Sequence, residues 1–364
     1  MIAALTHAGV EVIECHATLW KGIEDRVNTT KGGWKKPAFW WRVIRAYGQL
    51  IWHFLKLPDF DILMVGYPGQ LDVYLAKLLS VLKRKPLVWD VFMSIYLVAK
   101  ERGLDRESRF SVNLIRKIEA KALQLPDLLI QDTAEYVDWF YREYGIAPDR
   151  FRLVPTGADD RRFKPIELVE TMQDDQFIVL YYGTFIPNHG VMKIAQAVKE
   201  LAGKTDIIFK FIGEGPDKAA LEEYVHKLNL ENVRLHGWMS QEALLVQIAT
   251  SDICLGAFGD TPQSLMTVQN KIYECMAMGK PVVTGESPAT KAAFSSDTIV
   301  LCSRDDPADI AKTILTLNQD PERMQKLSKN SVVEFNKHYS IESLGCQLSA
   351  FLDALVFSKK EDRK

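Results

Sequence analysis

The sequence predicts two doubly wound α/β domains joined by a polar linker. Its 364 residues are enough for two domains. Short apolar runs alternate with helical patterns, and they do so in two successive series separated by a polar stretch at 161–175. Most of these runs are continuously apolar, which is typical of parallel strands covered by helices on both faces. We therefore expect a parallel sheet in each half of the chain.

The expected strands fall into two groups, one in each half of the chain. Helical patterns separate them, and a final helical pattern at 341–357 could pack on either domain. The runs are 11–15, 61–65, 86–90, 127–131 and 151–154 in the first half, and 177–182, 206–211, 232–235, 252–256, 281–284 and 298–302 in the second.

The beginning of the chain departs from the usual order of such a domain. Residues 1–15, MIAALTHAGVEVIEC, read as the end of a helix that Gly9 terminates, followed by a strand. A doubly wound domain normally opens with a strand, so the first domain is expected to lack it. Either the chain has lost that strand, or the start codon lies downstream of the ancestral one.

Composition excludes several classes of protein. Forty-five basic and 47 acidic residues give a net charge of −2, which argues against a nucleic-acid partner. Five scattered cysteines, without zinc spacing, favour free thiols in the cytoplasm and no structural metal. No apolar run reaches the roughly 18 residues of a spanning helix, and the first residues lack the pattern of a secretory signal.

An amphipathic stretch at 34–56 contains four of the eight tryptophans. Its pattern fits a helix lying on an anionic membrane surface, with tryptophans at the headgroup level. It also fits an ordinary domain helix whose apolar stripe faces the sheet. Both interpretations stay open. The apolar stripe is Trp40, Ile44, Tyr47, Ile51 and Phe54, and the polar stripe is Arg42, Arg45, Gln49, His53 and Lys56.

Two glycine turns in the second half join predicted strands to predicted helices. In YYGTFIPNHG, Gly183 and Gly190 would let backbone N–H groups approach an anion at a helix N-terminus, and His189 could donate to a phosphate. In FIGEGPDKAALEE, Gly213 and Gly215 make a similar turn. Either turn could equally be a plain connection without a ligand.

A charged pair begins the helical pattern in VQNKIYECMAMGKPVVTG, residues 268–285. The carboxylate of Glu274 could accept hydrogen bonds from sugar hydroxyls, and Lys271 could reach a phosphate. The alternative is an exposed salt bridge between residues three apart, which contributes little to stability.

In this order and spacing, the three segments resemble the second half of a family 4 glycosyltransferase with the GT-B fold. The resemblance covers about 151–302 and includes PTGADDRRFKP at 155–165, NVRLHGWMS at 232–240 and SDICLGAF at 251–258. Segments 60–79 and 86–94 are also similar, with lower specificity, to acceptor-domain segments of the family.

The resemblance implies transfer of a hexose from a nucleotide-sugar donor, with retention of configuration and without a metal or cofactor. Glu274 would hold the ribose hydroxyls and Lys271 would lie near the diphosphate, beside the loop shaped by Gly183 and Gly190. Asp90, at the end of its strand, would contact the reacting sugar or the acceptor hydroxyl. The acceptor would be lipid-linked or a glycan of polysaccharide or cell-envelope synthesis, reached at the cytoplasmic membrane face.

These expectations divide the chain into an acceptor-side domain at 1–165, a donor-binding domain at 166–340 and a C-terminal helix at 341–364. Many members of the family carry a second Glu eight positions before the one that corresponds to Glu274. Met266 occupies that position in this sequence. Thr184 and His189 replace frequent Arg and Lys residues of the phosphate loop. A catalytically inactive binding or scaffold protein and a sugar-nucleotide epimerase remain alternatives.

Overall fold

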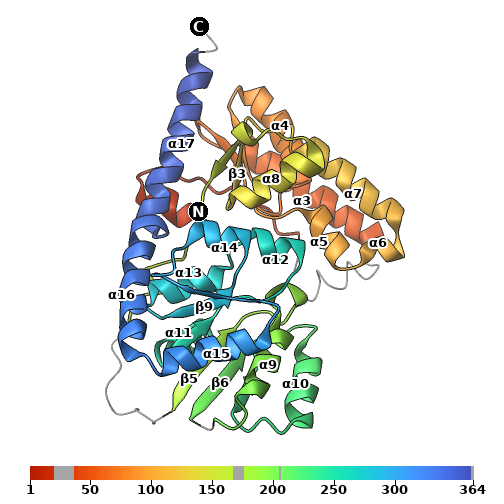
Figure 1. The fold of residues 1–364 in the computed structure, drawn as a ribbon. Helices are drawn as coiled ribbons and strands as arrows, with labels where there is room; N and C mark the ends of the chain where they lie inside the picture. Colours follow the sequence, from red (N-terminus) through yellow and green to blue (C-terminus); the bar gives the residue numbers. More distant parts are fainter. Residues whose placement is uncertain (20–36, 167–175, 205, 362–364) are drawn as a thin grey trace.

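The computed structural model describes residues 1–19, 37–166, 176–204 and 206–361. Two parallel sheets, each covered by helices, form two domains that face one another (Figure 1). Trp34 and most of the predicted linker lie outside the described residues.

The first sheet contains four parallel strands within the described residues, in the order β1-β2-β3-β4. They are β1 (Leu63–Val65), β2 (Leu87–Asp90), β3 (Leu128–Gln131) and β4 (Phe151–Leu153). The strand predicted at 11–15 is wrong, because this segment forms no strand. The helices are α1 (Ile2–His7), α3 (Pro37–Leu55), α4 (Asp72–Lys83), α5 (Ile95–Glu101), α6 (Leu104–Glu107), α7 (Arg109–Ala122) and α8 (Ala134–Tyr144).

The second sheet has six parallel strands in the order β10-β9-β8-β5-β6-β7 among the described residues. The order reverses between β5 and β8, which makes this the doubly wound arrangement that the sequence predicts. The strands are β5 (Phe177–Tyr182), β6 (Ile207–Ile212), β7 (Val233–His236), β8 (Ile253–Leu255), β9 (Val282–Gly285) and β10 (Val300–Cys302). The helices are α9 (Val191–Glu200), α10 (Lys218–Lys227), α11 (Gln241–Ala249), α12 (Pro262–Met266), α13 (Asn270–Ala277), α14 (Pro288–Ala293) and α15 (Pro307–Asn318).

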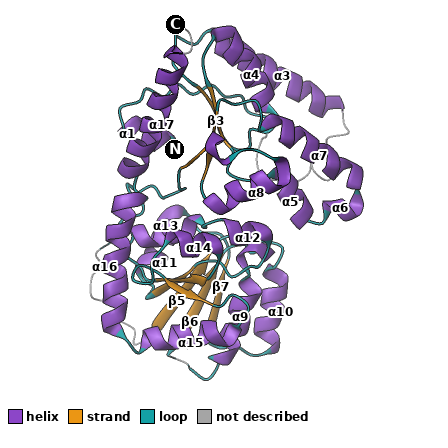
Figure 2. Cartoon of the chain, turned by 45° about the horizontal axis from the view of Figure 1, so that its top comes forward, coloured by secondary structure: helices purple, strands orange, loops and turns teal. Residues whose placement is uncertain are grey.

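Two long C-terminal helices connect the domains. α16 (Pro321–His338) covers the second domain, and α17 (Ile341–Glu361) continues alongside the first domain next to α1 (Figures 1 and 2). Leu344, Leu348 and Leu352 of α17 pack with Leu5 of α1 against Val88 and other residues of the first sheet. By length and hydropathy alone the segment 321–361 could cross a membrane, but here α17 covers one face of this sheet.

A buried carboxylate holds the connections of the first domain together. Glu119 of α7 is 1% exposed and accepts hydrogen bonds from Ser94 Oγ at 2.5 Å, Tyr144 Oη at 2.6 Å and Ile95 N at 2.8 Å. Gln70 donates a longer bond of 3.3 Å to the same carboxylate. Because a buried carboxylate needs such donors, these bonds fix the loop that leaves β2 relative to α7 and α8.

Glu119→Ala should make the first domain less stable, because Ser94, Tyr144 and Ile95 N would lose this buried acceptor. We expect the free energy of unfolding to fall by at least about 3 kcal/mol, measured by denaturant titration of tryptophan fluorescence. The control is Glu223→Ala on the exposed side of α10. Equal stability of the two variants would contradict the role of Glu119.

Candidate functional site

The crevice at the carboxyl ends of β5 and β8 lies where the strand order of the second sheet reverses, the usual ligand position in such sheets. The loops that follow these strands touch, since Phe258 N donates to the His189 carbonyl at 2.9 Å. Gly190 has φ 66°, and a Cβ there would overlap the backbone of Phe258 and Gly259. The predicted glycine at this turn is therefore needed for the close approach of the two loops.

The turn that contains Gly213 and Gly215 packs against the loop that contains Gly183. Gly183 N donates to Ile212 O at 2.9 Å, and Phe185 N donates to Glu214 O at 2.8 Å. A Cβ on Gly213 would overlap the Gly183 carbonyl, and one on Gly215 would overlap the backbone of Phe185. Close packing of the two loops thus explains why residues 213 and 215 are glycines. Gly183 lies next to the Lys271 side chain.

Lys271 is a buried basic residue that has no hydrogen-bond or ion-pair partner among the described residues. Its side chain is 6% exposed, and its Nζ lies 3.9 Å from the centre of the Tyr181 ring, facing Gly183. No described residue accepts a hydrogen bond from Nζ. Burial lowers the pKa of this amine to about 7. The predicted alternative of an exposed salt bridge with Glu274 is therefore wrong, because the amine is buried and makes only a cation–π contact.

In the first turn of the helix that carries Lys271, Ile272 N donates to the Gln269 carbonyl at 2.9 Å, and the N–H groups of Asn270 and Lys271 have no acceptor among the described residues. α13 begins after Gln269, whose side chain does not cap it. The first N–H groups of an α-helix have no partner within the helix, and the helix dipole makes this end positive. The amine of Lys271 and the first turn of α13 therefore form one positively polarised region, which suits an anion.

Glu274 lies one turn further along α13 and is partly exposed. Tyr182, the last residue of β5, donates a hydrogen bond of 2.6 Å to its Oε2. Burial raises the pKa of Glu274, whereas the Tyr182 bond and the Lys271 charge lower it. The other oxygen, Oε1, accepts no hydrogen bond from a described residue and could accept one from a hydroxyl group.

His189 is neutral in this structure. Its Nδ1 lies 2.8 Å from the Thr184 carbonyl and 3.2 Å from the Tyr181 hydroxyl. A carbonyl can only accept, so Nδ1 carries the proton and Nε2 is an acceptor. Burial and the nearby Lys271 charge lower the pKa of His189 to about 3. In this tautomer Nε2 suits a hydroxyl donor, and the expected donation to a phosphate would require the proton to move. The side chain of Thr184 is exposed.

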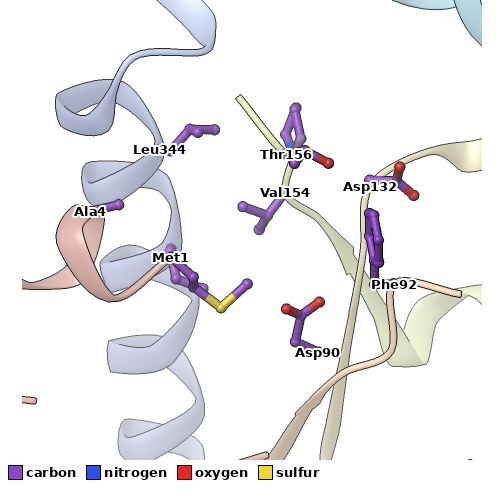
Figure 3. Close-up of a pocket in the computed structure, with 10 residues that line it drawn as sticks. Met1, Ala4, Asp90, Phe92, Asp132, Val154, Thr156 and Leu344 are labelled. Atoms are coloured by element: carbon purple, nitrogen blue, oxygen red, sulfur yellow. The ribbon is translucent and has the colours of Figure 1, made fainter. Parts of the chain in front are cut away.

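Asp90 stands at the end of β2, and the structure pairs it with Asp132, which directly follows the neighbouring strand β3. Both carboxylates line a cavity of about 120 Å³ together with Phe92 and with residues of α1 and α17 (Figure 3). Burial raises the pKa of Asp90 to about 6. Burial, together with the nearby Asp90 charge, raises the pKa of Asp132 to about 7. Both carboxyl groups can therefore be protonated near neutral pH.

Asp132 was not predicted, although it carries the same signal as Asp90: a carboxylate at the carboxyl end of a buried parallel strand. Tyr181 and Tyr182 were also missed, because apolar strand residues give no sign of such contacts. None of the residues predicted to bind the donor lines the Asp90 cavity. The structure therefore brings Lys271, Gly183 and His189 together and leaves Asp90 in a separate space of the first domain.

Helix α12 and the loop before α9 form hydrogen bonds with the first domain. Gln263 N donates to Glu101 at 2.8 Å, Asn188 Nδ2 donates to the same carboxylate at 3.2 Å, and Thr133 donates to the Met266 carbonyl at 2.5 Å. The Met266 side chain packs into the apolar core of the first domain. Where the family often has a polar Glu, this chain has an apolar contact between the domains.

Comparison with protein families supports the predicted relationship. Residues 176–320 match the family model described as glycosyl transferases group 1. This match confirms that the second domain resembles group 1 glycosyl transferases, and the narrower assignment to family 4 stays a prediction.

Two curated proteins are similar to parts of the chain. One is an MMP α-(1→4)-mannosyltransferase of Mycolicibacterium hassiacum, 22% identical over 241 residues, which cover 65% of this chain and 56% of that protein. The other is an uncharacterized glycosyltransferase of Methanocaldococcus jannaschii, 28% identical over 169 residues, covering 45% of this chain and 44% of that protein. The chain thus spans about half the length of the curated relatives that it matches.

Solved structures confirm the GT-B fold. HepE of Anabaena in complex with UDP superposes with a TM-score of 0.66 at 16% identity, covering 84% of this chain and 82% of HepE. Sucrose-phosphate synthase of Thermosynechococcus elongatus gives a TM-score of 0.67 at 18% identity, covering 87% and 78% of the two chains.

The buried amine of Lys271 should lower the stability of the fold. Its pKa falls from 10.5 in the unfolded chain to about 7 in the folded chain. Between about pH 7 and pH 10.5 the unfolded state binds one more proton than the folded state. The destabilisation caused by Lys271 therefore decreases as the pH rises. We expect Lys271→Met to be more stable than the wild type at pH 7 by at least about 1 kcal/mol, and this difference to shrink towards pH 10.

Denaturant titrations at pH 7 and pH 10 measure this difference. Lys199→Met, at an exposed position of α9, is the control and should show no such pH dependence relative to the wild type. A Lys271→Met variant less stable than the wild type at pH 7 would show that Lys271 has a partner in solution.

Proposed function

We propose that this chain, whose residues 176–320 are a group 1 glycosyl transferase domain, moves a sugar from a nucleoside diphosphate sugar to a lipid-linked or glycan acceptor. One observation carries the proposal: the partnerless Lys271 amine is buried beside the uncapped start of α13. Placing a lone cation there is costly, and a bound diphosphate would offset that cost.

In the proposed complex the diphosphate lies between Lys271, the first turn of α13 and the Gly183 loop. Glu274, held by Tyr182, accepts hydrogen bonds from the ribose hydroxyls. His189 Nε2 accepts from a hydroxyl of the donor. HepE was solved with UDP and with UDP-glucose, which supports a nucleoside diphosphate and makes uridine the first base to test.

In the proposed reaction the bond between the anomeric carbon and the diphosphate oxygen breaks, and its electron pair leaves with the diphosphate. A new bond forms between that carbon and the acceptor oxygen. It forms on the face of the sugar that the diphosphate leaves, because the family resemblance implies retention of configuration. Lys271 and the helix dipole stabilise the developing negative charge without a metal. Asp90, coupled to Asp132, accepts the proton of the acceptor hydroxyl.

A second candidate function is a binding or scaffold protein that has kept the fold without turnover. Met266 favours it, because its side chain packs into the first domain where a sugar-contacting Glu is frequent in the family. The two candidates differ in one measurement. The transferase consumes a nucleotide sugar and releases the nucleoside diphosphate, whereas the scaffold protein does not.

Glu274→Ala should weaken binding of UDP by about tenfold or more, because a charge-assisted hydrogen bond to ribose is lost. Isothermal titration with UDP and GDP measures the affinity, and a thermal-shift series with UDP- and GDP-sugars identifies the base. Glu223→Ala is the matched control. Unchanged affinity in Glu274→Ala would remove this residue from the site.

Asp90→Asn should lower kcat by about hundredfold while the affinity for UDP stays unchanged, since Asp90 acts in the other domain. The wild-type rate should fall as the pH drops below about 6, where Asp90 becomes protonated. This acid limb should disappear in Asp90→Asn. An unaltered pH profile in the variant would exclude Asp90 as the base.

A further inference from the structure

Helix α3 exposes several large apolar side chains to solvent. Of its 19 described residues, Ala46 and Phe54 are buried. Trp41 is 70% exposed, Ile44 62% and Trp52 54%. The interpretation of α3 as an ordinary helix with its predicted apolar stripe on the sheet is therefore wrong, since Phe54 is the buried member of that stripe. A soluble monomer seldom leaves so many large apolar groups exposed on one helix.

Cations on α3 alternate with the exposed tryptophans. Arg45 follows Trp41 by four residues, which places the two side chains next to one another on the helix surface. Lys56 follows Trp52 by the same spacing, and its Nζ lies 3.4 Å from the centre of the Trp52 ring. The sequence of α3 contains no Asp or Glu. The outer face of α3 is thus both apolar and positively charged.

The adjoining helix α4 adds a second exposed apolar row. Leu71, Leu78, Val81 and Leu82 are each more than 60% exposed, and they recur at the three- and four-residue spacing of one helix face. The Tyr47 hydroxyl of α3 donates to Asp72 of α4 at 2.7 Å, so the two helices lie together. Figure 2 shows α3 and α4 next to one another on the first domain.

We propose that the outer faces of α3 and α4 dock the first domain onto a bilayer that contains anionic lipid. The tryptophans would lie at the headgroup level, the leucine row of α4 would enter the acyl boundary, and Arg45 and Lys56 would contact lipid phosphates. This inference goes beyond the proposed transfer reaction and does not depend on it.

The charge pattern favours a lipid surface over a second copy of the chain. In a symmetric dimer through α3, the same face of both copies meets, so Arg45 and Lys56 would face cations, and α3 of neither copy carries a carboxylate to pair with them. An anionic bilayer supplies the phosphates that these cations need and the apolar layer that the tryptophans need.

Co-sedimentation of the whole chain with vesicles tests the proposal. We expect binding to vesicles that contain phosphatidylglycerol, weak binding to pure phosphatidylcholine vesicles, and release as the salt concentration rises. Arg45→Gln and Lys56→Gln should each weaken binding about fivefold. Trp41→Ser with Trp52→Ser, and Leu78→Ser with Val81→Ser, should weaken it through the apolar contribution.

Trp238→Ala is the matched control, because Trp238 is 61% exposed on the second domain and should leave binding unchanged. Circular dichroism and thermal unfolding confirm that each variant is folded. Equal binding to both kinds of vesicle, or variants that bind like the wild type, would overturn the proposal. So would a concentration-dependent dimer in sedimentation analysis that the tryptophan variants abolish in the absence of vesicles.

Discussion

The buried ammonium group of Lys271 is the constraint on which the second domain depends. Its nearest group is the face of Tyr181, and it lacks a carboxylate partner among the described residues. A cation in that position is costly for the fold and therefore shifts towards the neutral amine. A Cβ at Gly183 would lie 3.1 Å from the amine, so this glycine keeps the loop after β5 free of a side chain there. The arrangement costs stability, which the proposed anion site would explain.

The frame around this cation is apolar and rigid. Ile272, Cys275 and Met276 of α13 pack into the second core, so the helix that carries Lys271 and Glu274 cannot turn away from the crevice. The preceding helix α12 is tied to the first domain through Glu101 and Thr133. The position of the proposed donor site therefore depends on how the two domains meet, and Met266 contributes packing to that contact.

The first domain contains a pair of carboxyl groups instead of a buried amine. Asp90 and Asp132 lie in a small cavity that α1 and α17 close, and α17 is the chain's return from the second domain. The acidic pair and the Lys271 site consequently belong to separate domains. A mechanism that uses both needs the acceptor and the donor to meet between these domains, with the outer face of α3 and α4 fixing the acceptor side at a membrane.

The sequence by itself determined the two parallel sheets, ten of the eleven predicted strands and the glycine turns, because these follow from local apolar runs and backbone sterics. It also placed Lys271 and Glu274 on one helix. Only the tertiary structure decided that Lys271 has no hydrogen-bond partner among the described residues and that Asp132 lines the same cavity as Asp90. It also decided that Trp40, Ile44 and Ile51 of the predicted α3 stripe are exposed. It also showed that 11–15 forms no strand. Burial, pairing and pKa depend on neighbours distant in the chain, and local spacing carries no information about them.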